Sequence, residues 1–299
     1  MASIREIEIE RDAPALTQLI RETQPTSVIN VASYVHRLRT VPEQARLRQW
    51  VAEVDGRVAA RADCWLTLFA EHSGSGELQL AVRGDQRRRG LGSALYDVAL
   101  GYLTTLDVDR ILTSFHENEG GVAFVEARGF VHVRAETESE LDPRTVGERA
   151  AGDVRPVSSI DPRLAYAIDI EATHDMPATE PFAGMPYEEW DDHVLQHPLF
   201  TAEGSFVVFD SGDAAAVSLL TVDHDTGRAS SLFTGTRAAY RGRGHALAAK
   251  LASIEWAAAN GVTRMVTYND ATNAPMLAVN RRLGYVPVGR RVEYLKKLR

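Results

Sequence analysis

Two stretches of the chain share one pattern, a short apolar strand followed by a helix with a single apolar face. In the first stretch, the helical spacing is carried by Leu91, Leu95, Val98 and Tyr102. In the second stretch, it is carried by Leu247, Leu251, Ile254 and Ala258. Apolar residues three or four positions apart lie on one side of a helix. The pattern therefore predicts a strand at 77–82 with a helix at 90–106, and a strand at 229–236 with a helix at 244–260.

The rest of the chain alternates strand-like and helix-like runs. Further strands are predicted at 4–9, 49–54, 58–69, 110–115, 131–138, 155–159, 206–210, 214–223, 264–268 and 292–298. Further helices are predicted at 14–22, 33–40, 120–128, 163–173 and 274–283. This alternation predicts an α/β fold with a mixed sheet in each half of the chain.

A basic, glycine-containing turn joins strand to helix in both stretches. It reads Arg87-Arg88-Arg89-Gly90-Leu91-Gly92 in the first half and Arg241-Gly242-Arg243-Gly244-His245-Ala246 in the second. Glycine allows a sharp turn and close approach of the backbone, and a helix start offers unpaired N–H groups and positive dipole charge. Both turns are therefore suited to holding phosphate.

A second motif follows each turn and repeats in register with it. Asn118, Gly129 and Phe130 recur as Asn273, Gly284 and Tyr285. The turns are offset by 154 residues (241 minus 87) and the second motifs by 155 (273 minus 118). The repeat predicts an N-terminal domain at 1–142 and a C-terminal domain at 154–299. The segment 143–153 lacks core periodicity and is the expected linker.

This pair of motifs resembles the GCN5-related N-acetyltransferase (GNAT) superfamily, and the whole chain resembles a tandem acetyltransferase. In that family the first motif wraps the pyrophosphate of acetyl-CoA and the second lies along its pantetheine arm. The resemblance implies two tandem GNAT-like acyl-CoA N-acyltransferase domains with acetyl-CoA (CoA) as co-substrate.

The resemblance also implies which residues bind the cofactor. In the second half they are Thr234, Gly235, Thr236, Arg241, Gly242, Arg243, Gly244, His245, Ala246, Asn269, Asn273 and Asn280. In the first half they are Val82, Arg87, Arg88, Arg89, Gly90, Leu91, Gly92 and Asn118. Asn273 and Asn280 are two helical turns apart and share a face, where they could bond cofactor amides or serve as ordinary caps.

The group that protonates the leaving thiolate is open. Many relatives have a tyrosine where this chain has Asn280 and, in the first half, Val125. An amide has no proton to give at neutral pH, although it can bond a thiolate. Asn280 and Tyr268 are therefore weak catalytic candidates, with Tyr240 and unassisted departure of the thiolate as alternatives.

The general base is open as well. Many relatives place a glutamate where this chain has Gly76 and Ser230, and strand alternation should turn the neighbouring Glu77 to the other face. The sequence therefore supports no glutamate there, and deprotonation of the amine through water is an open alternative. A proline-rich loop offers further acids and bases, with surface or packing roles as the alternative: His174, Asp175, Glu180, Asp191, His193 and His197. Their spacing matches no familiar zinc pattern, and no metal is expected.

Composition narrows the partners. The net charge of −8 argues against nucleic acid or an anionic membrane and favours a cationic amine. The first residues lack an apolar signal-peptide core, and no apolar run has membrane-spanning length, so a cytoplasmic protein is expected. The expected oligomeric state is a monomer or a homodimer.

The leading hypothesis is an acetyl-CoA-dependent N-acetyltransferase acting on a small-molecule amine. Gly120-Gly121 weakens the second-motif helix of the first half, so the C-terminal half is the expected catalyst. The first half is then expected either to bind CoA without turnover or to be a structural partner. The alternative is a non-catalytic CoA-binding sensor or scaffold protein. A P-loop hydrolase is excluded because neither turn contains Gly-Lys-Ser/Thr.

Overall fold

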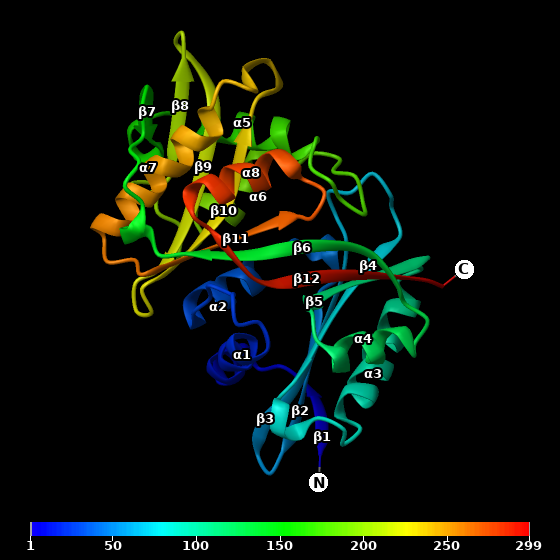
Figure 1. Ribbon diagram of the computed structural model, residues 1–299. Helices are drawn as coiled ribbons and strands as arrows, with labels where there is room; N and C mark the ends of the chain where they lie inside the picture. The colour runs from blue at the N-terminus through cyan, green and yellow to red at the C-terminus, as the bar shows by residue number, and fades with distance from the viewer. Residues whose placement is uncertain (1, 299) are drawn as a thin grey trace. The chain divides into compact units, whose positions relative to one another are not determined.

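The computed structural model describes residues 2–298 (Figure 1). The chain forms two compact units, and the boundaries between them lie inside two of its strands. Unit 1 comprises Met1–Ala135 with Arg290–Arg299, and unit 2 comprises Glu136–Gly289. The boundaries lie within β6 (Val131–Leu141) and β12 (Val286–Lys297).

These units differ from the predicted division at 142 and 154. The end of β6 pairs with β11 (Arg264–Asp270) of unit 2, and the end of β12 pairs with β5 (Arg110–His116) of unit 1. Apolar periodicity predicts that a strand exists but not which strand lies beside it, so this exchange was not visible in the sequence. The expected linker holds a short 3₁₀ turn, Pro143–Thr145, and reaches the start of β7 (Asp153–Pro156).

The sheet of unit 1 has the strand order β1-β2-β3-β4-β5-β12. Its other strands are β1 (Ser3–Glu6), β2 (Arg48–Val54), β3 (Arg57–Leu66) and β4 (Ser75–Val82). Helices α1 (Ile9–Thr23) and α2 (Val31–Thr40) lie on one face, and α3 (Leu91–Thr105) and α4 (Glu119–Glu126) lie on the other (Figure 1). The core beneath α3 is fully buried and includes Leu95, Leu103 and Ile111.

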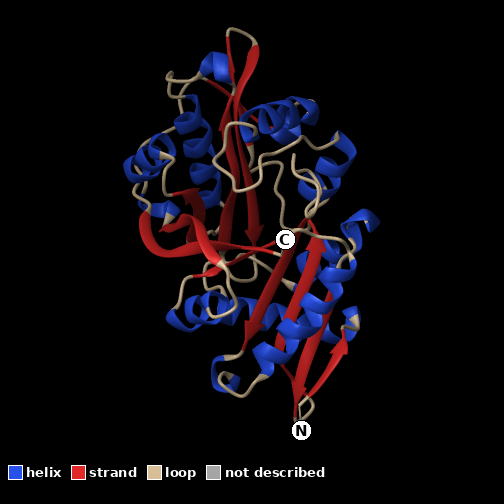
Figure 2. Ribbon diagram, turned by 90° about the vertical axis from the view of Figure 1, so that its right-hand side faces the viewer, coloured by secondary structure: helices blue, strands red, loops and turns tan. Residues whose placement is uncertain are grey.

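The sheet of unit 2 has the order β6-β11-β10-β9-β8-β7. It contains β8 (Phe206–Asp210), β9 (Asp213–Asp223) and β10 (Arg228–Thr236). Its helices are α5 (Pro162–Thr173), α6 (Tyr187–Trp190), α7 (His245–Ala259) and α8 (Ala274–Leu283), and a π-helical turn spans Asp191–Leu195. Further 3₁₀ turns lie at Glu43–Ala45, Gly84–Gln86, Val157–Ser159 and Ala238–Tyr240. Figure 2 shows the strands of both units in red with helices beside them. No helix within residues 2–298 has the length and apolar character to cross a membrane.

The N-terminal prediction was wrong in part. The expected strand at 4–9 ends at Glu6, and α1 begins at Ile9. The reason is the side chain of Asp12, which accepts a hydrogen bond of 2.8 Å from the backbone N–H of Glu8 and a second of 2.7 Å from Arg5. A carboxylate in the first turn of a helix stabilises its N-terminus, so the chain turns to helix despite the alternating isoleucines.

Each unit has two parallel central strands that pair briefly and then separate. β4 pairs with β5 only over Ser75–Glu77, and β10 pairs with β11 only over Arg228–Ser230. Beyond these points the facing strand edges do not pair with each other. Unpaired backbone groups need other partners, so each separation offers hydrogen bonds to an extended ligand.

Candidate functional site

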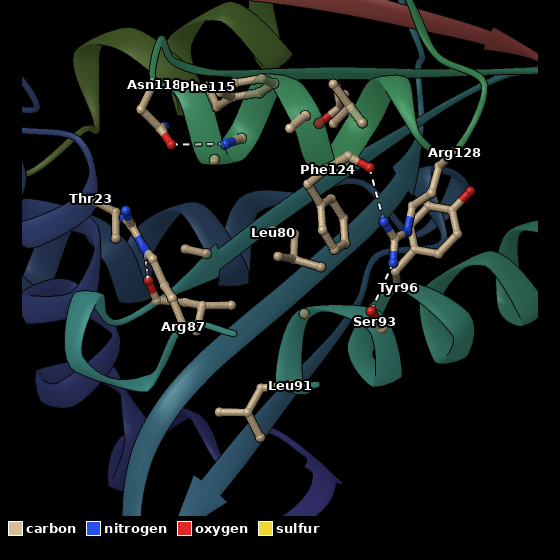
Figure 3. Close-up of a pocket in the computed structure, with 18 of the residues that line it drawn as sticks. Thr23, Leu80, Arg87, Leu91, Ser93, Tyr96, Phe115, Asn118, Phe124 and Arg128 are labelled. Carbon is tan, nitrogen blue, oxygen red and sulfur yellow. Dashed lines mark hydrogen bonds between the residues drawn. The ribbon is translucent and has the colours of Figure 1, made fainter. Parts of the chain in front are cut away.

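A cavity of about 520 Å³ in unit 1 occupies the region where β4 and β5 separate. Its walls come from β4, the basic turn, the first turns of α3 and α4, and the end of β5 (Figure 3). Aliphatic and aromatic side chains make up much of the lining: Leu78, Leu80, Val82, Tyr96, Phe115, Phe124, Val125 and Phe130. An apolar slot with unpaired backbone groups along one wall suits a long, thin ligand that carries amides.

The basic turn forms one end of this cavity. Gly90 has φ +84°, which a residue with a side chain rarely adopts, and a Cβ on Gly92 would lie 3.3 Å from the ring of Phe124. Arg87 Nε donates to the carbonyl oxygen of Val82 at 3.3 Å. Within residues 2–298, neither Arg87 nor its two neighbours, Arg88 and Arg89, forms an ion pair. Their charges are therefore available to phosphate oxygens.

The second motif of unit 1 forms the opposite wall. The side chain of Asn118 accepts from the backbone N–H of Gly121 at 2.9 Å and donates to the carbonyl of His116 at 2.9 Å, so it caps α4 (Figure 3). Arg128 donates to Ser93 Oγ at 2.8 Å and lies 3.5 Å from the ring centre of Phe124. This contact ties α4 to the start of α3 and fixes the width of the cavity.

The cavity also reaches the sheet face that α1 and α2 cover, through Gln79 and His116. Gln79 Nε2 donates to Ser114 Oγ at 3.2 Å, and Arg291 Nε approaches the same oxygen at 3.4 Å. Glu77 lies on this face, two residues before Gln79. Burial, followed by the negative charge of Glu293, raises the pKa of Glu77 to about 7, while Arg291 and Arg37 lower it.

Sequence reasoning missed Glu77. The predicted direction of its side chain is confirmed, because a Cβ on Gly76 would meet Leu103 on the α3 side, and residue 77 turns the other way. That other face is the polar one, however, and it includes the buried ion pair Arg61–Asp63, with Arg37 3.8 Å from Asp63. The sequence did contain a signal for this polar face, namely the charged residues at alternate positions of the neighbouring strand β3.

The turn of unit 2 has the predicted backbone form but not free charges. Arg241 Nη2 lies 2.5 Å from Asp175 Oδ2, and Arg243 Nη1 lies 2.8 Å from Asp210 Oδ2. His245 Nε2 lies 3.1 Å from the same oxygen of Asp210. Gly242 and Gly244 have φ of +76° and +83°. A phosphate group arriving at this turn would compete with carboxylates already bound there.

The asparagines predicted to bind cofactor in unit 2 bond within the protein. Asn273 caps α8 by accepting from the N–H of Met276 at 3.2 Å. Asn280 is buried and donates to Asn269 Oδ1 at 2.5 Å. Asn273 therefore caps α8 through its side-chain oxygen, and Asn280 faces the separated strand β11 through Asn269.

The candidate acids of unit 2 lie apart. Tyr268 is half-buried on β11, opposite Glu138 of β6. The hydroxyl of Tyr240 donates to Asp213 Oδ2 at 2.7 Å, and this hydrogen bond raises the pKa of Tyr240. A phenol that already donates to a carboxylate is a poor proton donor to a thiolate.

The face of unit 2 that corresponds to the Glu77 face is apolar. The paired residues Ala216 and Thr236 of β9 and β10 correspond to the paired residues Ala60 and Val82 of β3 and β4. With the strands matched in this way, unit 2 has Val217, Leu219 and Phe233 where unit 1 has Arg61, Asp63 and Gln79. All three pack in the cluster with Ile168 and Trp190. A Cβ on Gly235 would lie 2.6 Å from Ala172 of α5. Ser230 stands where unit 1 has Glu77, and the buried carboxylate on this side, Asp169 of α5, accepts a hydrogen bond of 2.8 Å from Trp190 Nε1. This face is therefore filled by packed side chains, and Asp169 is already bonded within the protein.

The acids and bases of the proline-rich loop do not converge. His174 and His193 each bond the backbone carbonyl four residues earlier at 2.7 Å, and His197 accepts from the N–H of Leu199 at 3.3 Å. Asp175 pairs with Arg241, as described above. Across residues 2–298, no three histidine, cysteine or carboxylate side chains lie together in a way that could hold a metal ion.

Comparison with known proteins agrees with the repeated motifs. The model of the Acetyltransferase (GNAT) family matches residues 14–130 and again residues 167–285. No curated protein sequence matches the chain.

Solved structures resemble the chain over its whole length. A GCN5-related N-acetyltransferase from Sphaerobacter thermophilus superposes with a TM-score of 0.74 at 21% identity, covering 100% of this chain and 96% of that one. A tandem GNAT protein from the clavulanic acid biosynthesis pathway gives 0.73 at 20% identity, covering 99% and 98%. Saccharomyces cerevisiae N-myristoyltransferase with bound myristoyl-CoA gives 0.67 at 11% identity, covering 98% and 78%. At these identities the likeness concerns the fold, and the family rests on the two matched regions. The chain therefore belongs to the acetyltransferase (GNAT) family, with one family domain in each half.

Proposed function

We propose that this protein transfers the acetyl group of acetyl-CoA to the amine of a small molecule, and that the reaction takes place in unit 1. The observation that carries the proposal is the cavity of unit 1, which leads from a basic turn without ion pairs in the described structure to Gln79, on the sheet face that also carries Glu77. The hypothesis from the sequence favoured the C-terminal half. In unit 2 the arginines of the basic turn are paired with carboxylates, and the corresponding sheet face is packed with apolar side chains. Both features favour unit 1 as the catalytic half.

Binding follows from the cavity walls. The pyrophosphate is held by the N–H groups at the start of α3 and by the guanidinium groups of Arg87 and Arg88. The pantetheine amides pair with the free edge of β4 between Leu78 and Val82, as an added strand would. The thioester then lies near the point where β4 and β5 separate, close to Glu77.

The chemistry requires an unprotonated amine. Glu77 accepts a proton from the acceptor ammonium, directly or through one water, and a carboxylate with a pKa of about 7 is suited to this at neutral pH. The neutral nitrogen attacks the thioester carbon, the C–S bond breaks, CoA leaves as a thiolate, and the nitrogen loses its remaining extra proton to that thiolate or to water. Val125 stands where many relatives have a tyrosine, so this chain offers no phenol there, and the low pKa of a thiol permits departure without one.

The acceptor enters on the side that α1 and α2 cover. Thr23 and Gln24, at the end of α1, line the cavity together with His116. These polar groups make this end of the lining suited to a small molecule. The cation approaches a carboxylate, which agrees with the negative net charge of the chain.

The test is release of free thiol from acetyl-CoA when a panel of small amines is added, with the product confirmed as the N-acetyl amine by mass spectrometry. The proposal expects turnover with at least one amine and its loss in Glu77→Gln. Binding of acetyl-CoA without turnover across the panel, in a protein that is folded, would support the sensor or scaffold alternative instead.

A further inference from the structure

Unit 2 contains a buried lysine that no carboxylate neutralises. Lys250 of α7 is 2% exposed, and within residues 2–298 it forms no ion pair. Its Nζ donates to Ser231 Oγ at 3.2 Å and lies 5.1 Å from the ring centre of Tyr285. Burial alone lowers the pKa of Lys250 to about 7. A buried amine without a counter-ion costs stability, so its presence calls for a compensating role.

The lysine belongs to a strip of polar residues that replaces three apolar residues and one tyrosine of unit 1. Beneath α3 of unit 1, the strip consists of Ala62, Leu80, Tyr96 and Ala99. At the corresponding positions beneath α7, unit 2 has Ser218, Thr234, Lys250 and Ser253. Ser253 bonds Ser218 at 3.2 Å, and Thr234 bonds Ser231 at 3.4 Å. Four coordinated replacements make chance polarity at one position a poor explanation.

Two further polar atoms beside this strip lack a partner. The hydroxyl of Tyr285 and Oδ1 of Asn280 are buried and form no hydrogen bond with the described part of the chain. Tyr285 and Asn280 correspond to Phe130 and Val125, which line the cavity of unit 1. Lys250 carries three donors and uses one, and Tyr285 adds another. Asn280 Oδ1 is an acceptor and can take one of these donors, so the donors still outnumber it, and a ligand rich in acceptors would satisfy the rest.

The position of the lysine indicates which part of a ligand it meets. Ser231 is the first residue of β10 after the pairing with β11 ends. An acyl-CoA with its phosphates at Gly244 and its arm along β10 would bring its acyl group to this point. In unit 1 the cavity lining there consists of aliphatic side chains and rings, which suit an acetyl methyl group, and its phenol, Tyr96, already accepts a hydrogen bond of 3.0 Å from Lys296. In unit 2 it offers an amine and a phenol.

We propose that unit 2 binds an acyl-CoA whose acyl group ends in a carboxylate, such as the monothioester of a short dicarboxylic acid, with Lys250 as the counter-charge and Tyr285 as a second donor. The inference rests on the proposed binding of acyl-CoA in unit 1, which has the same architecture. Because Asp175 and Asp210 already pair with the arginines of the turn, the phosphate end contributes less in unit 2. The acyl end therefore decides which ligand binds there.

The experiment isolates unit 2 in the full chain with Gly92→Trp, because a large side chain at Gly92 would fill the unit 1 cavity beside Phe124. In this background, calorimetry compares succinyl-CoA with butyryl-CoA, which has the same chain length without the carboxylate. We expect about tenfold tighter binding of succinyl-CoA, the range of a charge-assisted hydrogen bond. The additional substitution Lys250→Met, an uncharged side chain of similar length, should abolish the preference.

Three outcomes overturn the inference. They are equal affinity of the two thioesters, a preference that survives Lys250→Met, and a mass increase located on Lys250, which would make the amine a nucleophile rather than a counter-ion. Lys250→Met should fold, because it removes a buried amine without removing an ion pair, and its melting temperature checks this. Failure here leaves the proposed function intact if the chain without Gly92→Trp still binds acetyl-CoA and releases thiol.

Discussion

Glu77 of β4 and Glu293 of β12 lie on the same face of the unit 1 sheet, on either side of β5. Leu112 of β5 is paired with Glu77, and Ser114, two residues on, is paired with Glu293. The charge of Glu293 adds to the effect of burial in raising the pKa of Glu77, and Arg134 Nη1 lies 3.6 Å from Glu293. The C-terminal strand thus adjusts the candidate base of the N-terminal half.

Removing the carboxylate of Glu77 should abolish most of the activity without harming the fold. We expect Glu77→Gln to lower kcat by about 100-fold at pH 7.5, within the range for loss of a general base. Glu43→Gln, on an exposed 3₁₀ turn, is the matched control and should keep full activity. Thiol release measures both. Equal rates for Glu77→Gln and wild type would show that another group, or water alone, takes the proton.

Glu77→Gln should also make the folded protein at least as stable as wild type at high pH. The folded pKa of Glu77 is raised above its ordinary value, so the folded state loses stability as the pH rises from about 4.5 to about 7. Glu77→Gln removes this cost, and its melting temperature at pH 8 should equal or exceed that of wild type. A lower melting temperature would mean that the charged form makes favourable contacts in the folded protein.

The dependence of kcat/KM on pH should reflect the interaction between Glu77 and Glu293. A base works in its deprotonated form, so kcat/KM should rise with pH through about 7. Glu293→Gln removes a negative charge beside Glu77 and should move this rise to lower pH. Glu188→Gln, on α6 of unit 2, should leave it unchanged. If the rise of kcat/KM occurs at the same pH in Glu293→Gln as in wild type, the group that titrates is not Glu77.

The two basic turns should differ in their importance for acetyl-CoA. Arg87 forms no ion pair in the described structure, whereas Arg241 is held by Asp175. We expect Arg87→Ala to weaken acetyl-CoA binding by about tenfold, because a charge-assisted bond to phosphate is lost, and Arg241→Ala to change it little. Calorimetry measures both. Weakening by Arg241→Ala alone would return the main site to unit 2.

The C-terminal strand should be part of the core of unit 1. Tyr294 is 4% exposed and stacks on Phe115 with ring centres 5.8 Å apart. Tyr294→Ala should lower the free energy of unfolding by about 3 kcal/mol, as expected for removal of a buried aromatic ring. Lys297→Ala, exposed on the same strand, should change it by less than about 0.5 kcal/mol. A small effect of Tyr294→Ala in chemical denaturation would show that β12 is dispensable.

The sequence predicted what is local. The strand, basic turn and helix around Gly90 and Gly244 follow from short-range spacing, and the structure has both. It could not predict pairings between distant segments. The exchange of β6 and β12, the ion pair of Arg241 with Asp175 and the proximity of Glu77 to Glu293 depend on which strands become neighbours. The proposed phosphate turn is therefore predictable from the sequence, but the proposed base and the half proposed to be catalytic are not.

The central claim is that acetyl-CoA binds unit 1 along β4, between the basic turn and Glu77. Hydrogen–deuterium exchange with and without acetyl-CoA locates the contact directly, because bound backbone amides exchange more slowly. We predict protection at residues 78–82 and 88–93, in wild type and not in Gly92→Trp. Protection confined to residues 232–246, or none in a protein that still releases thiol, would contradict the claim.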